Sequence, residues 1–329
     1  MLDKIKVNLS YHVYNTILQD MVRFEFFKAN GDVNRNEFLN CIIYNFYQSK
    51  LKKREQLKEE LTRNAVLTDI SNKNKELMIN SAIKIMDDFY NEDTSYRYHN
   101  HYFMIYPNKQ TEDFFNDIYQ NEIKNYVSIS AFIRRLLNEY ASLPQYLREN
   151  VAKRQEVIKL HTAIVGKNVA YFNVSNHEHK IAPFNLVRNR EETYGYLIGI
   201  DLNSKKLKPV SIKLSKIYNV TISKENFKFT KEQHEEMLKI ISSGVEFASG
   251  DIIKVKIKLT DAGVRMVEFK SHNRPNIVHL TDDIYEVSCT LSNFMNYFIS
   301  FGKEIKVLDN EDIKNRLRKF YSLALDNLD

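Results

Sequence analysis

Residues 4–9 read KIKVNL and alternate strictly between polar and apolar side chains. Strict alternation is typical of a strand with one face in a core and the other face in water. Ser10 follows directly, where a hydroxyl would cap a helix, and a second helix is expected from about Arg35. The outward face of the strand would carry Lys4, Lys6 and Asn8. This stretch therefore predicts a strand followed by two helices.

The same strand–helix–helix pattern returns about 98 residues later. Residues 102–106, YFMIY, predict a second strand, and Asn108 takes the capping position of Ser10. The second helices match at five apolar positions with an offset of 94 residues, namely Phe38, Leu39, Ile42, Ile43 and Phe46 in one copy and Phe132, Ile133, Leu136, Leu137 and Tyr140 in the other. Units this short cannot each bury a core, so the two strands are expected to pair antiparallel within one chain.

This order resembles the ribbon–helix–helix fold, in which two units form an antiparallel ribbon whose outward side chains enter the DNA major groove. The two units would cover residues 1–50 and 98–145 of a pseudo-dimeric domain spanning 1–145. Residues 50–64 and 71–90 predict two charged helices inserted between them. The resemblance implies nucleic-acid contacts from the outward residues of the first strand, Lys4, Lys6 and Asn8.

The second strand departs from the pattern of a DNA reader, because its outward positions are Tyr102, Met104 and Tyr106. Residues 1–150 also hold 20 Lys and Arg against 20 Asp and Glu, a net charge of zero. A scaffold without DNA-binding activity is therefore as well supported as a duplex reader.

The positive charge lies in one segment. Residues 151–220 hold 12 Lys and Arg against 5 Asp and Glu, a surplus of 7, while the whole chain carries +6. Clustered cations beside aromatic side chains suit phosphates and unstacked bases, so this segment predicts a polyanion site. A solvated lysine-rich surface is the plain alternative.

Five short strands follow a helix in this segment: NVAYFNV, HKIAPFNLV, TYGYLIGID, KPVSIKL and KIYNVTI. Their spacing predicts a small, bent β-barrel. Their order resembles the WYL domain, a barrel of the Sm/SH3 type found in bacterial regulators, and would place that domain with its linker helix at 146–225. Tyr196 and Leu197 match the Tyr-Leu of the family, whereas Gly195 stands where its Trp would be.

Several family arginines are replaced in this sequence. Lys213 and Lys216 take the places of two of them, His179 takes the place of a third, and Val210 the place of a fourth. Lysine keeps the charge without the bidentate fork of arginine, so a generally basic surface is favoured over a pocket for one defined ligand. The expected nucleic-acid-binding residues of the barrel are Tyr171, His179, Lys180, Arg188, Arg190, Tyr196, Lys213 and Lys216.

Residues 226–329 resemble the C-terminal extension often attached to WYL domains, which implies a mixed α/β dimerisation domain and a homodimer. The whole combination, an α+β chain, resembles the WYL accessory proteins of type VI-D CRISPR systems. That resemblance implies a single-stranded RNA-binding protein that modulates, and is expected to stimulate, a CRISPR RNA-guided RNA nuclease. Two alternatives stay open: a WYL-family transcriptional regulator that binds duplex DNA and senses an effector at its barrel, and a scaffold that bridges protein partners.

The sequence shows no sign of an enzyme, a cofactor or a metal site. It lacks G-x-G-x-x-G, Walker, HExxH and G-x-S-x-G patterns. Its two cysteines, Cys41 and Cys289, are far apart in sequence, so neither a disulfide scaffold nor a cysteine-based zinc site is expected. No stretch reaches 18 uninterrupted apolar residues and no signal peptide is evident, so a cytoplasmic location is expected, with no membrane partner.

Overall fold

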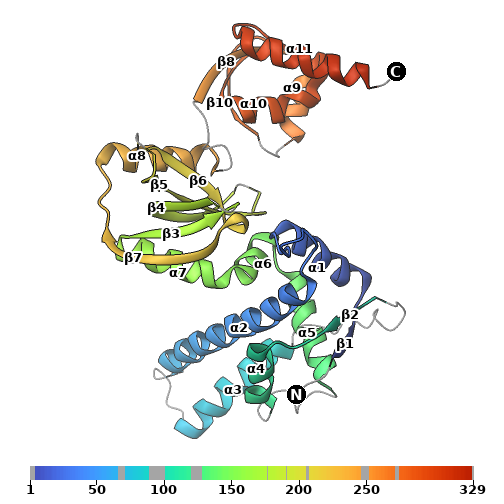
Figure 1. Ribbon diagram of the computed structural model, residues 1–329, viewed down its shortest axis with the longest axis vertical. Coiled ribbons are helices and arrows are strands. Elements are labelled where there is room, and N and C mark those ends of the chain that lie inside the picture. Colours follow the sequence, from blue (N-terminus) through green and yellow to red (C-terminus); the bar gives the residue numbers. More distant parts are fainter. Residues whose placement is uncertain are drawn as a thin grey trace. The chain divides into compact units, whose positions relative to one another are not determined.

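The protein folds into two compact units, Met1–Gln155 and Glu156–Asp329. The computed structural model describes residues 4–65, 71–88, 101–119, 128–175, 177–189, 191–204, 207–245, 252–270 and 274–327 (Figure 1). The architecture is mixed α+β, with one small antiparallel sheet in the first unit and two in the second. The expected division of the second unit at residue 225 stays a prediction.

The first unit contains the two repeats. The first repeat consists of β1 (Ile5–Asn8), α1 (Tyr11–Arg23) and α2 (Arg35–Ala65), and the second of β2 (Tyr102–Ile105), α4 (Lys109–Tyr119) and α5 (Ile129–Ser142). Helix α3 (Asn72–Asp88) lies between the repeats in sequence, and α6 (Gln145–Ala152) follows them. Helix α2 runs unbroken for 31 residues, so residues 50–64 continue it and do not form the separate helix expected. Neither Gly nor Pro interrupts this stretch, which leaves nothing to end the helix earlier.

The expected antiparallel pairing of the two strands is confirmed. Ile5 lies opposite Ile105, Lys6 opposite Met104, and Asn8 opposite Tyr102. With the repeat offset of 98 residues, Lys6 and Met104 are equivalent positions, so each pairs with its own counterpart. The ribbon therefore has a pseudo-two-fold axis that passes through the Lys6–Met104 pair.

The second helix of each repeat binds the strand of the other repeat. The Arg134 Nε on α5 donates to the Asn8 carbonyl on β1 (2.9 Å), and the Asn40 Nδ2 on α2 donates to the Tyr106 carbonyl after β2 (3.0 Å). Asn40 and Arg134 are equivalent at the helix offset of 94, as are Asn8 and Tyr106 at the strand offset of 98. These bonds cap both outer edges of the ribbon and interlock the repeats.

An aromatic core fills the space under the ribbon. All ten apolar positions matched between the second helices are buried, as the repeat pattern predicts. Phe38 packs edge-on against Phe26 and Tyr140, with ring centroids 4.9 and 6.5 Å apart. Val7 and Ile105 close this core from the ribbon, and both are fully buried.

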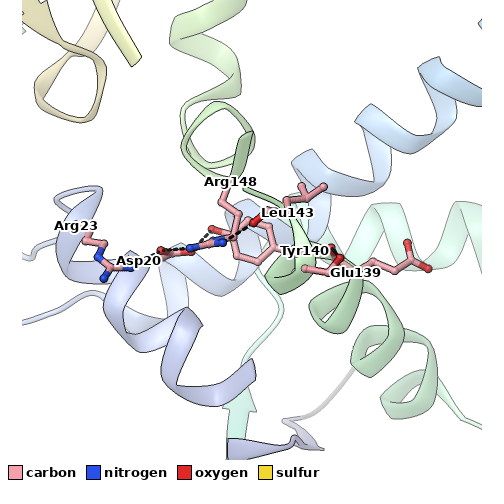
Figure 2. Close-up of polar contacts among 7 residues, drawn as sticks. Asp20, Arg23, Glu139, Tyr140, Leu143 and Arg148 are labelled. Atoms are coloured by element: carbon pink, nitrogen blue, oxygen red, sulfur yellow. Dashed lines mark hydrogen bonds and ion pairs between the residues drawn. The ribbon is translucent and has the colours of Figure 1, made fainter. Parts of the chain in front are cut away.

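A buried ionic cluster joins the helices of the first unit (Figure 2). The Asp20 carboxylate on α1 is fully buried and lies 2.6 Å from the Nε of Arg148 on α6. The Tyr140 hydroxyl on α5 donates to the same carboxylate at 3.1 Å. Burial raises the pKa of Asp20, and its hydrogen bond to Arg148 opposes that rise. Burial also raises the pKa of Tyr140 well above its usual range, so the phenol stays a donor.

The five-stranded sheet of the second unit has the strand order β6-β5-β4-β3-β7. Its elements are α7 (Arg154–Gly166), β3 (Asn168–Val174), β4 (His177–Arg188), β5 (Gly195–Asp201), β6 (Pro209–Lys213), a 3-10 turn (Leu214–Lys216), β7 (Tyr218–Asn226) and α8 (Lys231–Ser243). The sequence predicts a closed barrel, whereas the structure has an open sheet. Among the described strands, β6 and β7 lie at the two edges of the sheet and do not pair with each other.

Two helices explain why this sheet stays open. Leu160 and Ala163 of α7 pack with Phe172 on one face of the sheet, and Met237 of α8 packs with Ile198 on the other face. Figure 1 shows these two helices on opposite sides of the sheet. Because helices bury both apolar faces, the sheet does not have to close on itself to exclude water.

The remaining residues form a four-stranded antiparallel sheet with the strand order β11-β8-β10-β9. Its elements are β8 (Ile252–Leu259), α9 (Asp261–Phe269), β9 (Asn276–Thr281), β10 (Ile284–Thr290), α10 (Leu291–Phe298), a 3-10 segment (Ile299–Glu304), β11 (Ile305–Val307) and α11 (Glu311–Asp326). The inward strand positions, such as Ile257 and Val287, pack with Phe294, Phe298 and Ile313 of the helices in one buried cluster.

Replacing Asp20 with Asn should destabilise the first unit strongly, because the Arg148 guanidinium would stay buried without its counter-charge. We expect the free energy of unfolding of the first unit to fall by about 3–5 kcal/mol. Native-state hydrogen exchange of the α1 and α5 amides would measure this change within the intact chain. Arg23→Gln is the matched control, because Arg23 is more exposed and lies 3.7 Å from the same carboxylate. An equal effect in both variants would contradict the assignment.

Candidate nucleic-acid interface

The predicted residues of the five-stranded sheet form two groups. In the first group, Tyr171 on β3 lies opposite Lys180 on β4. The Lys180 Nζ lies 5.8 Å from the centroid of the Tyr171 ring and 2.8 Å from the Glu225 Oε2 on β7. Hydrogen bonding to Glu225 raises the pKa of Lys180, so this ammonium stays charged. The first group thus offers a cation beside an aromatic ring, partly neutralised by one carboxylate.

His179 lies next to Lys180 in sequence but on the other face of the sheet, because strand side chains alternate. Its ring stacks on Phe172 at 6.0 Å with an interplanar angle of 20°. Phe172 is fully buried and belongs to the cluster under α7. His179 therefore covers an apolar core and does not share a face with Tyr171 and Lys180.

The second group lies where β5 begins and β6 ends. Lys213 on β6 lies opposite Tyr196 on β5, and its Nζ lies 3.2 Å from the centroid of the Tyr194 ring. This is a close cation–π contact. Arg188 lies opposite Gly195 and forms an ion pair with Glu192 at 2.9 Å. The sequence predicts a stacking role for Tyr196, whereas the lysine of this group contacts Tyr194.

Asn189 holds Tyr194 in place. Its buried side chain accepts hydrogen bonds at Oδ1 from the amides of Thr193 (2.9 Å) and Tyr194 (3.0 Å). Its Nδ2 donates to the Thr193 hydroxyl at 2.8 Å. Asn side chains commonly organise turns in this way, so Asn189 was detectable in principle as a turn residue between two strands. Tyr196, two residues further on, is half-buried against the cluster that contains Ile198.

The two groups are far apart along the sheet, so the predicted residues do not form one continuous surface. The Leu202 amide, just after β5, donates to the Lys180 carbonyl, whereas Lys213 lies opposite Tyr196 at the start of β5. About six residues of strand separate these points, which is about 20 Å at roughly 3.3 Å per residue. Lys216 is exposed on the 3-10 turn after β6, and Arg190 lies outside the described residues.

The ribbon of the first unit carries a smaller set of candidates. The Lys6 Nζ lies 4.3 Å from the centroid of the Tyr102 ring on the opposite strand. Asn8 lies opposite Tyr102, and Lys4 is exposed just before β1. The outward face therefore carries polar side chains on β1. On β2 it carries the aromatic ring of Tyr102 and the side chain of Met104, which lies opposite Lys6.

The described residues contain no group of three or more His, Cys, Asp and Glu side chains that could hold a metal ion. Neither cysteine forms a disulfide, and burial raises the pKa of Cys289 to about 12. Among the helices placed by the structure, none is long and apolar enough to span a membrane.

The fold is shared with a solved structure described as a "CRISPR Cas-related protein". The two chains are 19% identical, and the match covers 100% of this chain and 94% of the other with a TM-score of 0.79. A second solved structure, proteasome accessory factor B/C of Arthrobacter aurescens, is 14% identical with a TM-score of 0.31, over 61% of this chain and 32% of that one. The sequence matches no protein-family model. It also matches no curated protein.

Replacing Asn189 with Ala should release the turn before β5. The amides of Thr193 and Tyr194 would no longer have their acceptor, so their hydrogen exchange should accelerate markedly, while β4 and β5 stay protected. Hydrogen exchange with mass spectrometry or NMR would read this out. Asn203→Ala, in the exposed turn after β5, is a control that should leave residues 193 and 194 unchanged. Unaltered exchange at both amides in Asn189→Ala would contradict the role given to Asn189.

Proposed function

We propose that this protein is a non-enzymatic, single-stranded RNA-binding accessory protein that modulates a CRISPR RNA-guided RNA nuclease. The observation that carries the proposal is the contact of Lys213 with Tyr194 beside Arg188 on the five-stranded sheet. A cation held against an aromatic ring offers phosphate attraction and a stacking surface in one place, which suits unpaired nucleotides. The solved structure of similar fold, described as CRISPR Cas-related, supports the choice of a CRISPR-associated role.

We also propose a family assignment for the separate parts of the fold. The interlocked repeats of the first unit are proposed to be a fused ribbon–helix–helix pair, in keeping with the Lys6–Met104 pseudo-dyad. The five-stranded sheet, with its turn at Leu214–Lys216, is proposed to be an open variant of the WYL domain. Residues 226–329 are proposed to mediate a homodimer, and the RNA-guided nuclease is the proposed protein partner.

A duplex-DNA regulator is the alternative function. Lys6 and Asn8 on the exposed face of the ribbon favour it, since a groove-reading ribbon presents polar side chains. The opposite strand weakens it, because Met104 and Tyr102 lie directly opposite Lys6 and Asn8. A two-fold symmetric operator would meet two chemically different halves on this ribbon.

Charge reversal at Lys213 and Lys216 should weaken RNA binding and make it less sensitive to salt. For a single strand, the slope of log K against log salt falls by about 0.7 with every phosphate that the protein ceases to bind. The measurement is fluorescence anisotropy of an unstructured RNA over a salt series. Reversal at Lys4 and Lys6 changes the charge by the same amount on the ribbon and should have the smaller effect.

The same four lysines separate the competing functions. Gel shifts at matched salt would compare the RNA with duplex DNA from the protein's own promoter region. Tight operator-specific binding that depends on Lys4 and Lys6 would favour the transcriptional regulator. The absence of any nucleic-acid affinity at physiological salt would favour a scaffold. Addition of the protein to a type VI-D nuclease assay would then test modulation directly.

A further inference from the structure

The four-stranded sheet has one face covered by helices and one face lined with lysine. Val255, Ile257 and Leu259 of β8 are buried toward the helices, and the alternate residues, Lys254, Lys256 and Lys258, are exposed on the other face. Figure 1 shows α9, α10 and α11 on one side of β8 and β10. Lys306 on the neighbouring strand β11 is also exposed. We call Lys254, Lys256, Lys258 and Lys306 the lysine face.

The strand register places two of these lysines directly opposite each other. Lys306 and Lys258 are Cα partners in the antiparallel ladder between β11 and β8. Like charges at directly opposite positions destabilise a sheet. A polar neutral residue at either position would keep the surface in water without this repulsion. The pair thus places two ammonium groups side by side on one face, where an anion between them would reduce their repulsion.

Carboxylates neutralise only part of the lysine face. The Lys254 Nζ lies 3.5 Å from the Glu286 Oε1, and Lys258 forms an ion pair with Asp283. The third nearby carboxylate, Asp309, accepts a hydrogen bond from the backbone amide of Lys256 at 2.9 Å. Within the described residues, the ammonium groups of Lys256 and Lys306 form no ion pair. The surplus positive charge thus lies on Lys256 of β8 and on Lys306 of the edge strand β11.

We propose that the lysine face is a track for the phosphate backbone of a single-stranded nucleic acid. Lysines on two adjacent strands form a row of exposed cations of the kind that follows a polyanion. Besides the lysines, the outward positions of β9 and β10 include Asn276, Val278, Ile284, Glu286 and Ser288, and none of these described side chains is aromatic. The track therefore holds phosphates and does not stack bases.

The charge of the face argues against a second copy of this chain as its occupant. Two copies that packed this face together about a two-fold axis would bring two surfaces of net positive charge into contact, and like charges oppose such contact. A phosphate chain carries the complementary charge. The choice of RNA as the nucleic acid rests on the proposed function, whereas the placement of the track rests on the lysine register alone.

The test removes Lys256 and Lys306, whose ammonium groups form no ion pair within the described residues. Lys256→Gln with Lys306→Gln should lower the slope of log K against log salt by about 1.4 for an oligouridylate RNA, which corresponds to two phosphate contacts. The matched control is Arg265→Gln with Lys319→Gln, which removes the same charge from exposed positions on α9 and α11. The control should keep the wild-type slope. A single-stranded DNA of the same length distinguishes a general phosphate track from one selective for RNA.

Thermal unfolding provides a second, independent measurement. Lys306→Gln removes the repulsion with Lys258, so its Tm should equal or exceed that of the wild type while its RNA affinity falls. Unchanged affinity and salt slope in the Lys256/Lys306 variant would overturn the track. If Lys213 and Lys216 reversal still abolished binding in that case, the proposed function would stand without it. Loss of binding only in the Lys256/Lys306 variant would support the track and overturn the site on the five-stranded sheet.

Discussion

The first unit depends on the pairing of two strands that are only four residues long. A two-stranded ribbon of this length has too little buried surface to be stable in water. Its stability comes from the helices below it, since α2 and α5 each bind the strand of the other repeat and cap its outer edge. Neither repeat can therefore fold without the other. The buried contact of Asp20 with Arg148 and Tyr140 adds a second link, which joins the first helix of one repeat to the last helices of the unit.

Patterns of period two and 3.6 predicted the elements that depend on local sequence. The alternation in residues 4–9 and the ten matched apolar positions were enough to predict the ribbon, its antiparallel pairing and its core. These patterns could not predict whether the five-stranded sheet closes into a barrel. Closure depends on which helices cover the sheet, and α7 and α8 cover both faces. The continuous helix α2 was also missed, because a change in surface charge along a helix does not end it.

The candidate site could be predicted as a charged segment but not as a geometry. Composition located the surplus of basic residues, yet strand alternation and register decide which of them meet. His179 and Lys180 are neighbours in sequence and point to opposite faces, whereas Lys213 meets Tyr194 across two strands and a turn. That contact depends on the side chain of Asn189, which organises the turn. The opposed lysines at 258 and 306 depend on a register set by residues far apart in sequence.

The pseudo-two-fold axis through Lys6 and Met104 has a consequence for how this unit assembles. A ribbon made from two separate chains forms in a bimolecular step, and its stability depends on protein concentration. Here the partner strand belongs to the same chain, so the ribbon forms in a unimolecular step at any dilution. An outward substitution also changes one half of the face, not both. The two halves can thus acquire different surface chemistry while they share one core, which is the state in which Lys6 now lies opposite Met104.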